Sequence, residues 1–157
     1  MAHAPALLVT KGLRRKSIPE GLWTKCPSCQ TVMFNKTLKE NLLVCSKCSY
    51  HFIMGAWERI RQLSDDDSFR EMDRNLQSED PLKFTAVKAY TDKIKQDQKK
   101  TGLKEACITG EAKIGGKSCA LGVTDSRFIM GSMGSVVGEK ITRLIEYALE
   151  HKLPLII

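Results

Sequence analysis

The stretch CPSCQTVMFNKTLKENLLVCSKC, residues 26–48, contains two Cys-x-x-Cys pairs separated by fifteen residues. Cys26 and Cys29 form the first pair, and Cys45 and Cys48 form the second. Two thiolates two residues apart can bind one ion from a single turn, and two such turns complete a tetrahedron. The spacing is typical of a zinc site and predicts that these four cysteines bind one structural Zn²⁺ ion.

A metal ion explains how so short a segment folds. A ribbon of about 30 residues buries too little apolar surface to fold alone, and a zinc-binding energy of about 10–16 kcal/mol can replace the missing core. We therefore expect residues 21–54 to form a four-cysteine zinc ribbon, with short strands at 31–34 and 41–44. Four thiolates leave the ion no open position, so we expect it to be structural and not catalytic.

Three alternatives remain open for the cysteine pairs. The first pair alone is compatible with a redox dithiol, iron also binds four thiolates, and His51 lies close enough in sequence to compete as a ligand. The second pair at zinc spacing disfavours the dithiol, and four available thiolates disfavour His51. His3 and His151 are scattered, no Ser–His–Asp or Cys–His set can be assembled, and we assign no catalytic residue.

Composition and charge indicate a globular chain with a basic front. Of its 157 residues, 42% are hydrophobic, and no apolar run approaches the ~20 residues that span a bilayer. Residues 1–52 hold eight Lys or Arg and two Glu, a net charge of +6, whereas residues 53–157 hold 17 basic and 16 acidic side chains, a net charge of +1. A basic N-terminal segment of this kind could bind nucleic acid, an acidic protein face or a phosphorylated ligand, or could simply be solvated. The apolar stretch at 4–9 precedes the basic cluster at 14–16, unlike a secretory signal, so we expect a cytoplasmic protein with a flexible tail over residues 1–20.

Beyond residue 54 the hydrophobic pattern predicts an α/β domain over residues 55–157. Helical spacing alternates with short apolar runs, and glycine, proline and aspartate mark the boundaries between them. We expect helices at 56–63, around 69–72, at 82–99 and, with Ser135 as the cap, at 136–151.

The clearest strand signal is a hairpin. Two glycines at 115–116 predict a two-residue turn between strands 106–114 and 117–124. In this register the two remaining cysteines, Cys107 and Cys119, face other residues across the ladder. We expect both to be ordinary small buried residues and not a disulfide pair.

Two further strands are expected, at 127–130 and 154–157, before and after the last helix. This order predicts a crossover onto a partly parallel sheet. The loop at 131–135 lacks the spacing of a phosphate loop, but it ends at a helix N-terminus, where backbone N–H groups favour anions. A buried parallel strand needs a covering layer, so we expect the chain to be a fragment of a longer protein.

Several segments together carry a resemblance to a known family. They are GLWTKCPSC (21–29), ENLLVCSKC (40–48), DPLKF (80–84), KKTGLKEA (99–106) and GSMGSVVGEKITRLIEYALEHKLPLII (131–157). In this order they resemble the beta subunit of the carboxyltransferase component of bacterial and plastid acetyl-coenzyme A carboxylase. The likeness runs from about residue 21 to residue 157.

The resemblance implies a zinc ribbon followed by the beginning of a crotonase-like carboxyltransferase domain built from ββα units. It implies transfer of a carboxyl group from carboxybiotin on a biotin carboxyl carrier protein to acetyl-CoA, giving malonyl-CoA for fatty acid biosynthesis. It further implies an alpha subunit in an α2β2 assembly and a biotin carboxylase within an ATP-dependent multisubunit complex. The biotin would therefore be supplied by a partner.

Two features depart from the family pattern or fall outside the chain. Family members usually have glycine after the second cysteine of each pair, whereas this chain has Gln30 and Ser49. A non-glycine residue at positive φ costs roughly 1–2 kcal/mol, which makes the turn geometry an open point. The family's oxyanion-hole glycines would follow Ile157, so we expect the isolated fragment to be inactive.

Two further functions are considered for the ribbon. Its basic charge favours a nucleic-acid-binding module, with Lys25, Lys36, Lys39 and Lys47 as candidate contacts. Aromatic residues are few, and we expect Phe34, Tyr50 and Phe52 to pack around the metal instead of stacking on bases. A ribbon that covers the coenzyme pocket or a subunit interface is the preferred alternative.

Overall fold

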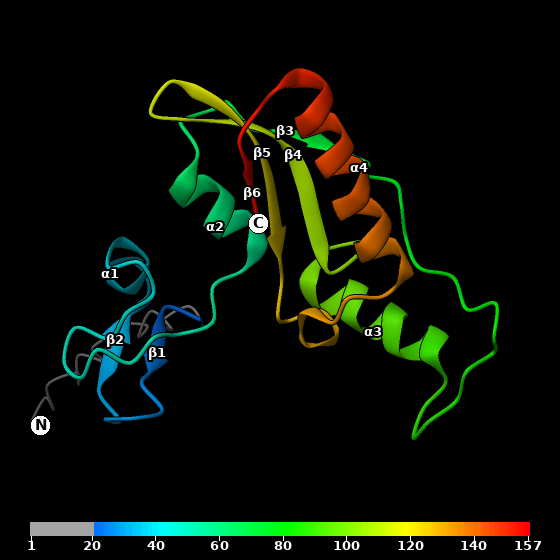
Figure 1. Cartoon of the computed structure of the whole chain (residues 1–157). Coiled ribbons are helices and arrows are strands. Elements are labelled where there is room, and N and C mark those ends of the chain that lie inside the picture. Colours follow the sequence, from blue (N-terminus) through cyan, green and yellow to red (C-terminus); the bar gives the residue numbers. More distant parts are fainter. Residues whose placement is uncertain (1–20) are drawn as a thin grey trace, which may run out of the picture. The chain divides into compact units, whose positions relative to one another are not determined.

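The structure, a computed structural model, describes residues 21–157, which divide between Phe52 and Ile53 into two compact units (Figure 1). The expected tail at 1–20 lies outside the described residues. The first unit contains β1 (Trp23–Lys25), β2 (Val32–Phe34) and α1 (Asn35–Glu40).

Strands β1 and β2 form an antiparallel pair in the first unit, with Trp23 opposite Phe34. The expected strand at 31–34 is confirmed as β2, but the one at 41–44 is wrong. Helix α1 ends just before residue 41. Leu42 and Leu43 then adopt the left-handed region, at φ 53° and 60°, which a strand does not use. Only Val44 makes a strand-like contact there, an isolated bridge to His51.

The second unit is an α/β arrangement around a four-stranded sheet. Its strand order is β3-β4-β5-β6, with β6 parallel to β5 and the other neighbours antiparallel. Its elements are α2 (Ala56–Leu63), β3 (Arg70–Met72), α3 (Tyr90–Thr101), β4 (Cys107–Ile114), β5 (Lys117–Thr124), the 3-10 turn η1 (Ile129–Gly131), α4 (Ser135–His151) and β6 (Leu155–Ile156).

The central hairpin of the second unit is confirmed in its turn and its register. Gly115 and Gly116, both at positive φ, separate β4 from β5. Cys107 lies opposite Thr124 and Cys119 opposite Ala112, and both cysteines are free and buried. The predicted helix at 56–63 matches α2, and the parallel pairing of β5 with β6 confirms the partly parallel sheet.

Helices cover both faces of this sheet, as Figure 1 shows for α2 and α4 on either side of β4 and β5. Successive strand residues point to opposite faces. On β5, Leu121 belongs to the core cluster that contains Ile60 of α2, whereas Ala120 packs with Leu144 and Ala148 of α4. The alternation explains why a run of small and apolar residues is buried on both sides.

Two helix predictions in the second unit need correction. Residues around 69–72 form β3, not a helix, because Arg70 and Met72 pair with β4 and left-handed residues at Asp67 and Asp73 bound the strand. Helix α3 begins at Tyr90, not at residue 82. The chain before it folds back, so that Tyr90 N donates to Phe84 O over 3.0 Å.

The expected strand at 127–130 is also wrong. The residues form η1, and two buried carboxylates hold the turn: Asp97 accepts from Ile129 N at 2.9 Å and Asp125 accepts from Arg127 N at 3.0 Å. Gly134 is the N-cap of α4 and Ser135 is its first residue, with no side-chain cap bond, so the expected Ser135 cap is not formed. Among residues 21–157 no helix is both long and apolar enough to cross a bilayer.

Candidate metal centre

The two Cys-x-x-Cys segments fold into equivalent turns. In the first, Gln30 N donates to Cys26 O at 2.9 Å; in the second, Ser49 N donates to Cys45 O at 2.9 Å. Each first cysteine also donates its own N–H across the turn, to Thr31 O or to Tyr50 O, at 2.8 Å in both cases. The repeated pattern places two sulfurs on the inner side of each turn.

Both turns need a left-handed residue after their second cysteine. Gln30 has φ 60° and Ser49 has φ 59°, the region that favours glycine. The departure from glycine therefore leaves the turn geometry intact. Gln30 partly offsets its strain, because its Nε2 donates to Pro27 O at 3.0 Å.

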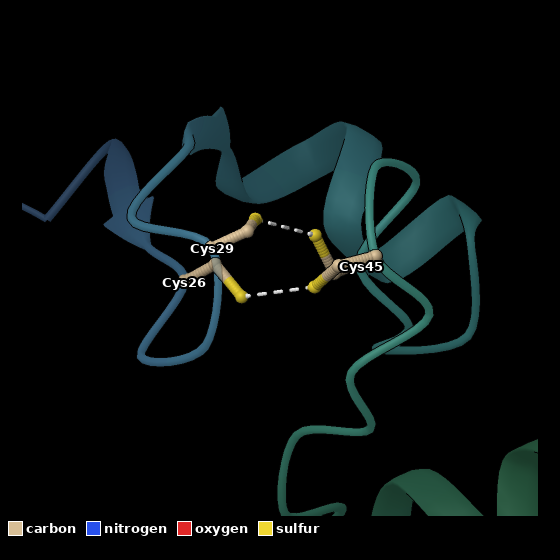
Figure 2. A group of neighbouring side chains, drawn as sticks. Cys26, Cys29 and Cys45 are labelled. Atoms are coloured by element: carbon tan, nitrogen blue, oxygen red, sulfur yellow. Dashed lines mark hydrogen bonds between the residues drawn. The ribbon is translucent and has the colours of Figure 1, made fainter.

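The four sulfurs converge on one point, all within 4.8 Å of one another, and Figure 2 shows Cys26 and Cys29 of one turn facing Cys45 of the other. The Cys26–Cys48 and Cys29–Cys45 sulfurs are each 3.7 Å apart. Zn–S bonds of about 2.3 Å in a tetrahedron place sulfurs about 3.8 Å apart, whereas a disulfide requires about 2.05 Å. The arrangement fits a tetrahedral zinc ion and does not fit a disulfide.

The surroundings shift the pKa values of three of the thiols, and not all in the same direction. Burial raises the pKa of Cys26 to about 11. The Thr31 hydroxyl, 3.3 Å from the Cys29 sulfur, lowers the pKa of Cys29 to about 6, and the backbone N–H of Tyr50 lowers the pKa of Cys48. Since zinc binds the thiolate form, the lowered pKa values of Cys29 and Cys48 favour ligation, whereas the ion must displace the proton of Cys26. Sequence reasoning missed Thr31; a hydroxyl two residues after a ligand is the available signal.

Comparison with known proteins places this centre in a described domain. Residues 23–48 match the family described as the acetyl-CoA carboxylase zinc finger domain. Over 148 residues the chain is 51% identical to the acetyl-coenzyme A carboxylase carboxyl transferase subunit beta of Desulforamulus reducens. This match covers 94% of the chain and 50% of the relative. The chain matches the N-terminal portion of the carboxyltransferase beta subunit.

Two further proteins are similar to this chain, one in sequence and one in fold. The beta/alpha protein of Natranaerobius thermophilus is 50% identical over 139 residues, covering 88% of the chain and 22% of that relative. A single-chain, multi-domain long-chain acyl-CoA carboxylase shares the fold with a TM-score of 0.52 at 17% identity, over 67% of this chain and 11% of that one. The α/β fold after the ribbon is therefore shared with part of that carboxylase. The chain spans about half the length of the first beta-subunit relative.

The other candidate residues do not belong to the four-cysteine group. His51 is exposed and outside the sulfur group, and His151 stacks on Tyr147 with ring centroids 4.0 Å apart. His3 lies outside the described residues. The loop at 131–135 leads from η1 into α4, and at its start Gly131 N donates to Phe128 O at 2.8 Å. Among the described residues the four cysteines are the group of His, Cys, Asp or Glu side chains suited to a metal.

Proposed function

We propose that this chain is the zinc-ribbon and leading carboxyltransferase portion of a subunit that moves a carboxyl group from carboxybiotin to acetyl-CoA, forming malonyl-CoA for fatty acid biosynthesis. Identity of 51% over 94% of the chain to a named carboxyltransferase beta subunit is the observation that carries the proposal. The ribbon would occupy residues 21–54 and the carboxyltransferase portion residues 55–157. No catalytic side chain is assigned within them.

The metal assignment is part of this proposal. Cys26, Cys29, Cys45 and Cys48 would bind one zinc ion, and the 3.7 Å sulfur separations support tetrahedral ligation. With four thiolate ligands the ion has no position for substrate. Its chemistry is to hold the two turns together, which replaces the core that the first unit lacks.

The partners follow from the same relatives. An alpha subunit is supported by the Natranaerobius relative, whose name joins beta and alpha in one chain. A biotin carboxyl carrier protein would deliver the carboxyl group, and an ATP-dependent biotin carboxylase would load it. We place this assembly in the cytoplasm.

A chimera tests the enzymatic proposal. The matched half of the Desulforamulus beta subunit is replaced by this chain, the chimera is paired with its alpha subunit, and malonyl-CoA formation from acetyl-CoA and carboxybiotin is measured. We expect activity comparable with the parent enzyme. A folded, zinc-loaded and alpha-bound chimera without activity would refute the proposal.

A second candidate function, nucleic-acid binding by the ribbon, is favoured by exposure. Lys25, Lys36 and Lys47 are exposed, and Trp23 and Tyr50 are 56% and 40% exposed. Phosphate contacts by these lysines would make the affinity fall steeply with salt. Filter binding of single-stranded RNA at two salt concentrations separates this function from enzyme activity, since weak or salt-insensitive binding would exclude it.

A further inference from the structure

The four sulfurs are not equivalent in their access to solvent. Cys26 and Cys45 are 0% and 1% exposed, Cys29 is half-buried and Cys48 is exposed. The two 3.7 Å contacts each join a buried sulfur of one turn to a more accessible sulfur of the other, Cys26 with Cys48 and Cys29 with Cys45. Each pair thus contains a sulfur that an oxidant can reach and a protected sulfur in contact with it.

We propose that these cross-turn pairs are sites of reversible oxidation, in which a peroxide first joins Cys48 to Cys26 and thereby releases the metal. The inference goes beyond carboxyl transfer and rests on the proposed zinc ligation by the four cysteines. An accessible thiolate beside a resolving thiolate is the arrangement found in redox-responsive cysteines.

The chemistry balances without a further reactant. The Cys48 thiolate attacks one oxygen of hydrogen peroxide, the O–O bond breaks, and a sulfenic acid and hydroxide form. The Cys26 thiolate then attacks the Cys48 sulfur, forming the S–S bond and expelling a second hydroxide. Two thiolates lose two electrons in total, and one peroxide is reduced to two hydroxide ions.

The Cys26 and Cys48 sulfurs lie close enough to form a bond with little movement. Both 3.7 Å contacts run between the turns, and closing one of them to about 2.05 Å moves the two sulfurs together by about 1.7 Å. Cys48 is the most accessible member, so the Cys26–Cys48 bond forms before Cys29–Cys45.

Loss of two ligands is sufficient to release the ion. Two thiolates remain after the first disulfide, whereas a structural zinc site uses four ligands. The first unit then loses the metal that replaces its core.

Cys107 and Cys119, at 1% and 3% exposure, lie in the second unit outside the four-cysteine group, and they provide an internal comparison with other buried thiols.

Tryptic peptides distinguish the candidate disulfides. Cleavage after lysine and arginine puts Cys26 and Cys29 on peptide 26–36, Cys45 on peptide 40–47 and Cys48 on peptide 48–59. The zinc-loaded 157-residue chain is treated with one equivalent of hydrogen peroxide. Free thiols are then trapped with N-ethylmaleimide, released zinc is measured with a metallochromic dye, and the disulfides are mapped by fragmentation mass spectrometry.

We expect the first disulfide to link peptides 26–36 and 48–59 through Cys26, with zinc release in equal amount. Thiol reduction in the presence of zinc should restore binding, and the Cys107→Ala/Cys119→Ala variant should behave identically. A first link between 40–47 and 48–59, a Cys26–Cys29 bond, or zinc release without any disulfide overturns the proposal. Absence of stoichiometric zinc before oxidation overturns the zinc assignment as well, which separates the two failures.

Discussion

Gln30 and Ser49 provide the sharpest test of how the ribbon is built. Each has a positive φ near 60°, where an L-residue is destabilised by roughly 1–2 kcal/mol. Glycine removes this strain but adds about 0.5–1 kcal/mol of conformational entropy to the unfolded chain. The expected net gain is about 0.5–1 kcal/mol for Ser49→Gly. It is smaller for Gln30→Gly, because the bond from Gln30 Nε2 to Pro27 O is lost.

Since ribbon folding and zinc binding are coupled, the gain appears as zinc affinity. A net gain of about 0.5–1 kcal/mol corresponds to roughly two- to fivefold tighter binding. Competition against a chromophoric zinc chelator at fixed pH measures this for the single and double glycine variants. Both turns bind the same ion, so the double variant measures how far the two effects are coupled.

Matched controls decide the cause of any change. Ser49→Ala removes the hydroxyl but keeps a Cβ in the left-handed region, so it should not tighten binding. Lys47→Gly introduces glycine in the same turn at a residue without positive φ, and it should weaken binding. If Ser49→Gly binds zinc no tighter than Ser49→Ala, backbone strain is not what limits the site, and the reasoning fails.

Four further predictions concern both units. Asp125→Asn should destabilise the second unit by about 2–3 kcal/mol in urea, because the buried carboxylate accepts bonds from Ala56 N and Arg127. Burial raises the pKa of Asp125 and of Asp97, but hydrogen bonds, chiefly from Arg127 and Lys93 respectively, leave both pKa values lowered. Their contribution to stability should therefore be complete above pH about 4 and be lost as the pH falls through the folded-state values; urea midpoints at about pH 7 and about pH 3 measure this. Gly110→Ala should lower the free energy of unfolding by roughly 1–3 kcal/mol, because the added Cβ would overlap Arg70 O and the Phe69 ring. Gly138→Ala, where the added Cβ meets nothing, should raise the free energy of unfolding by about 1 kcal/mol. Chelation of zinc should change the fluorescence of Trp23 in a Trp57→Phe background, while the urea midpoint of the second unit stays constant.

Local chemistry was sufficient to predict the convergence of the four cysteines and the hairpin. The Cys-x-x-Cys spacing needs no information from outside the ribbon, because each turn closes through bonds between residues four or five apart. The pair at 115–116 likewise determines the register of β4 and β5 by itself. The strand expected at 41–44 was wrong because nothing in the side chains of Leu42 and Leu43 signals that their backbone is left-handed.

The errors near residues 67–73 and 127–131 share one physical origin. Phe69 and Met72 are three residues apart, as on one face of a helix, but β4 offers Arg70–Met72 backbone partners that a short isolated helix lacks. Ile129 and Met130, at φ 41° and 55°, adopt a conformation that β-branched and bulky residues disfavour. No local pattern predicts such a turn; it forms because Asp97, 32 residues away, accepts from Ile129 N, and Asp125 holds Arg127. The two buried carboxylates thus determine the path of the chain into α4. Removing the charge of either one should disorder η1 while the β4–β5 hairpin stays folded.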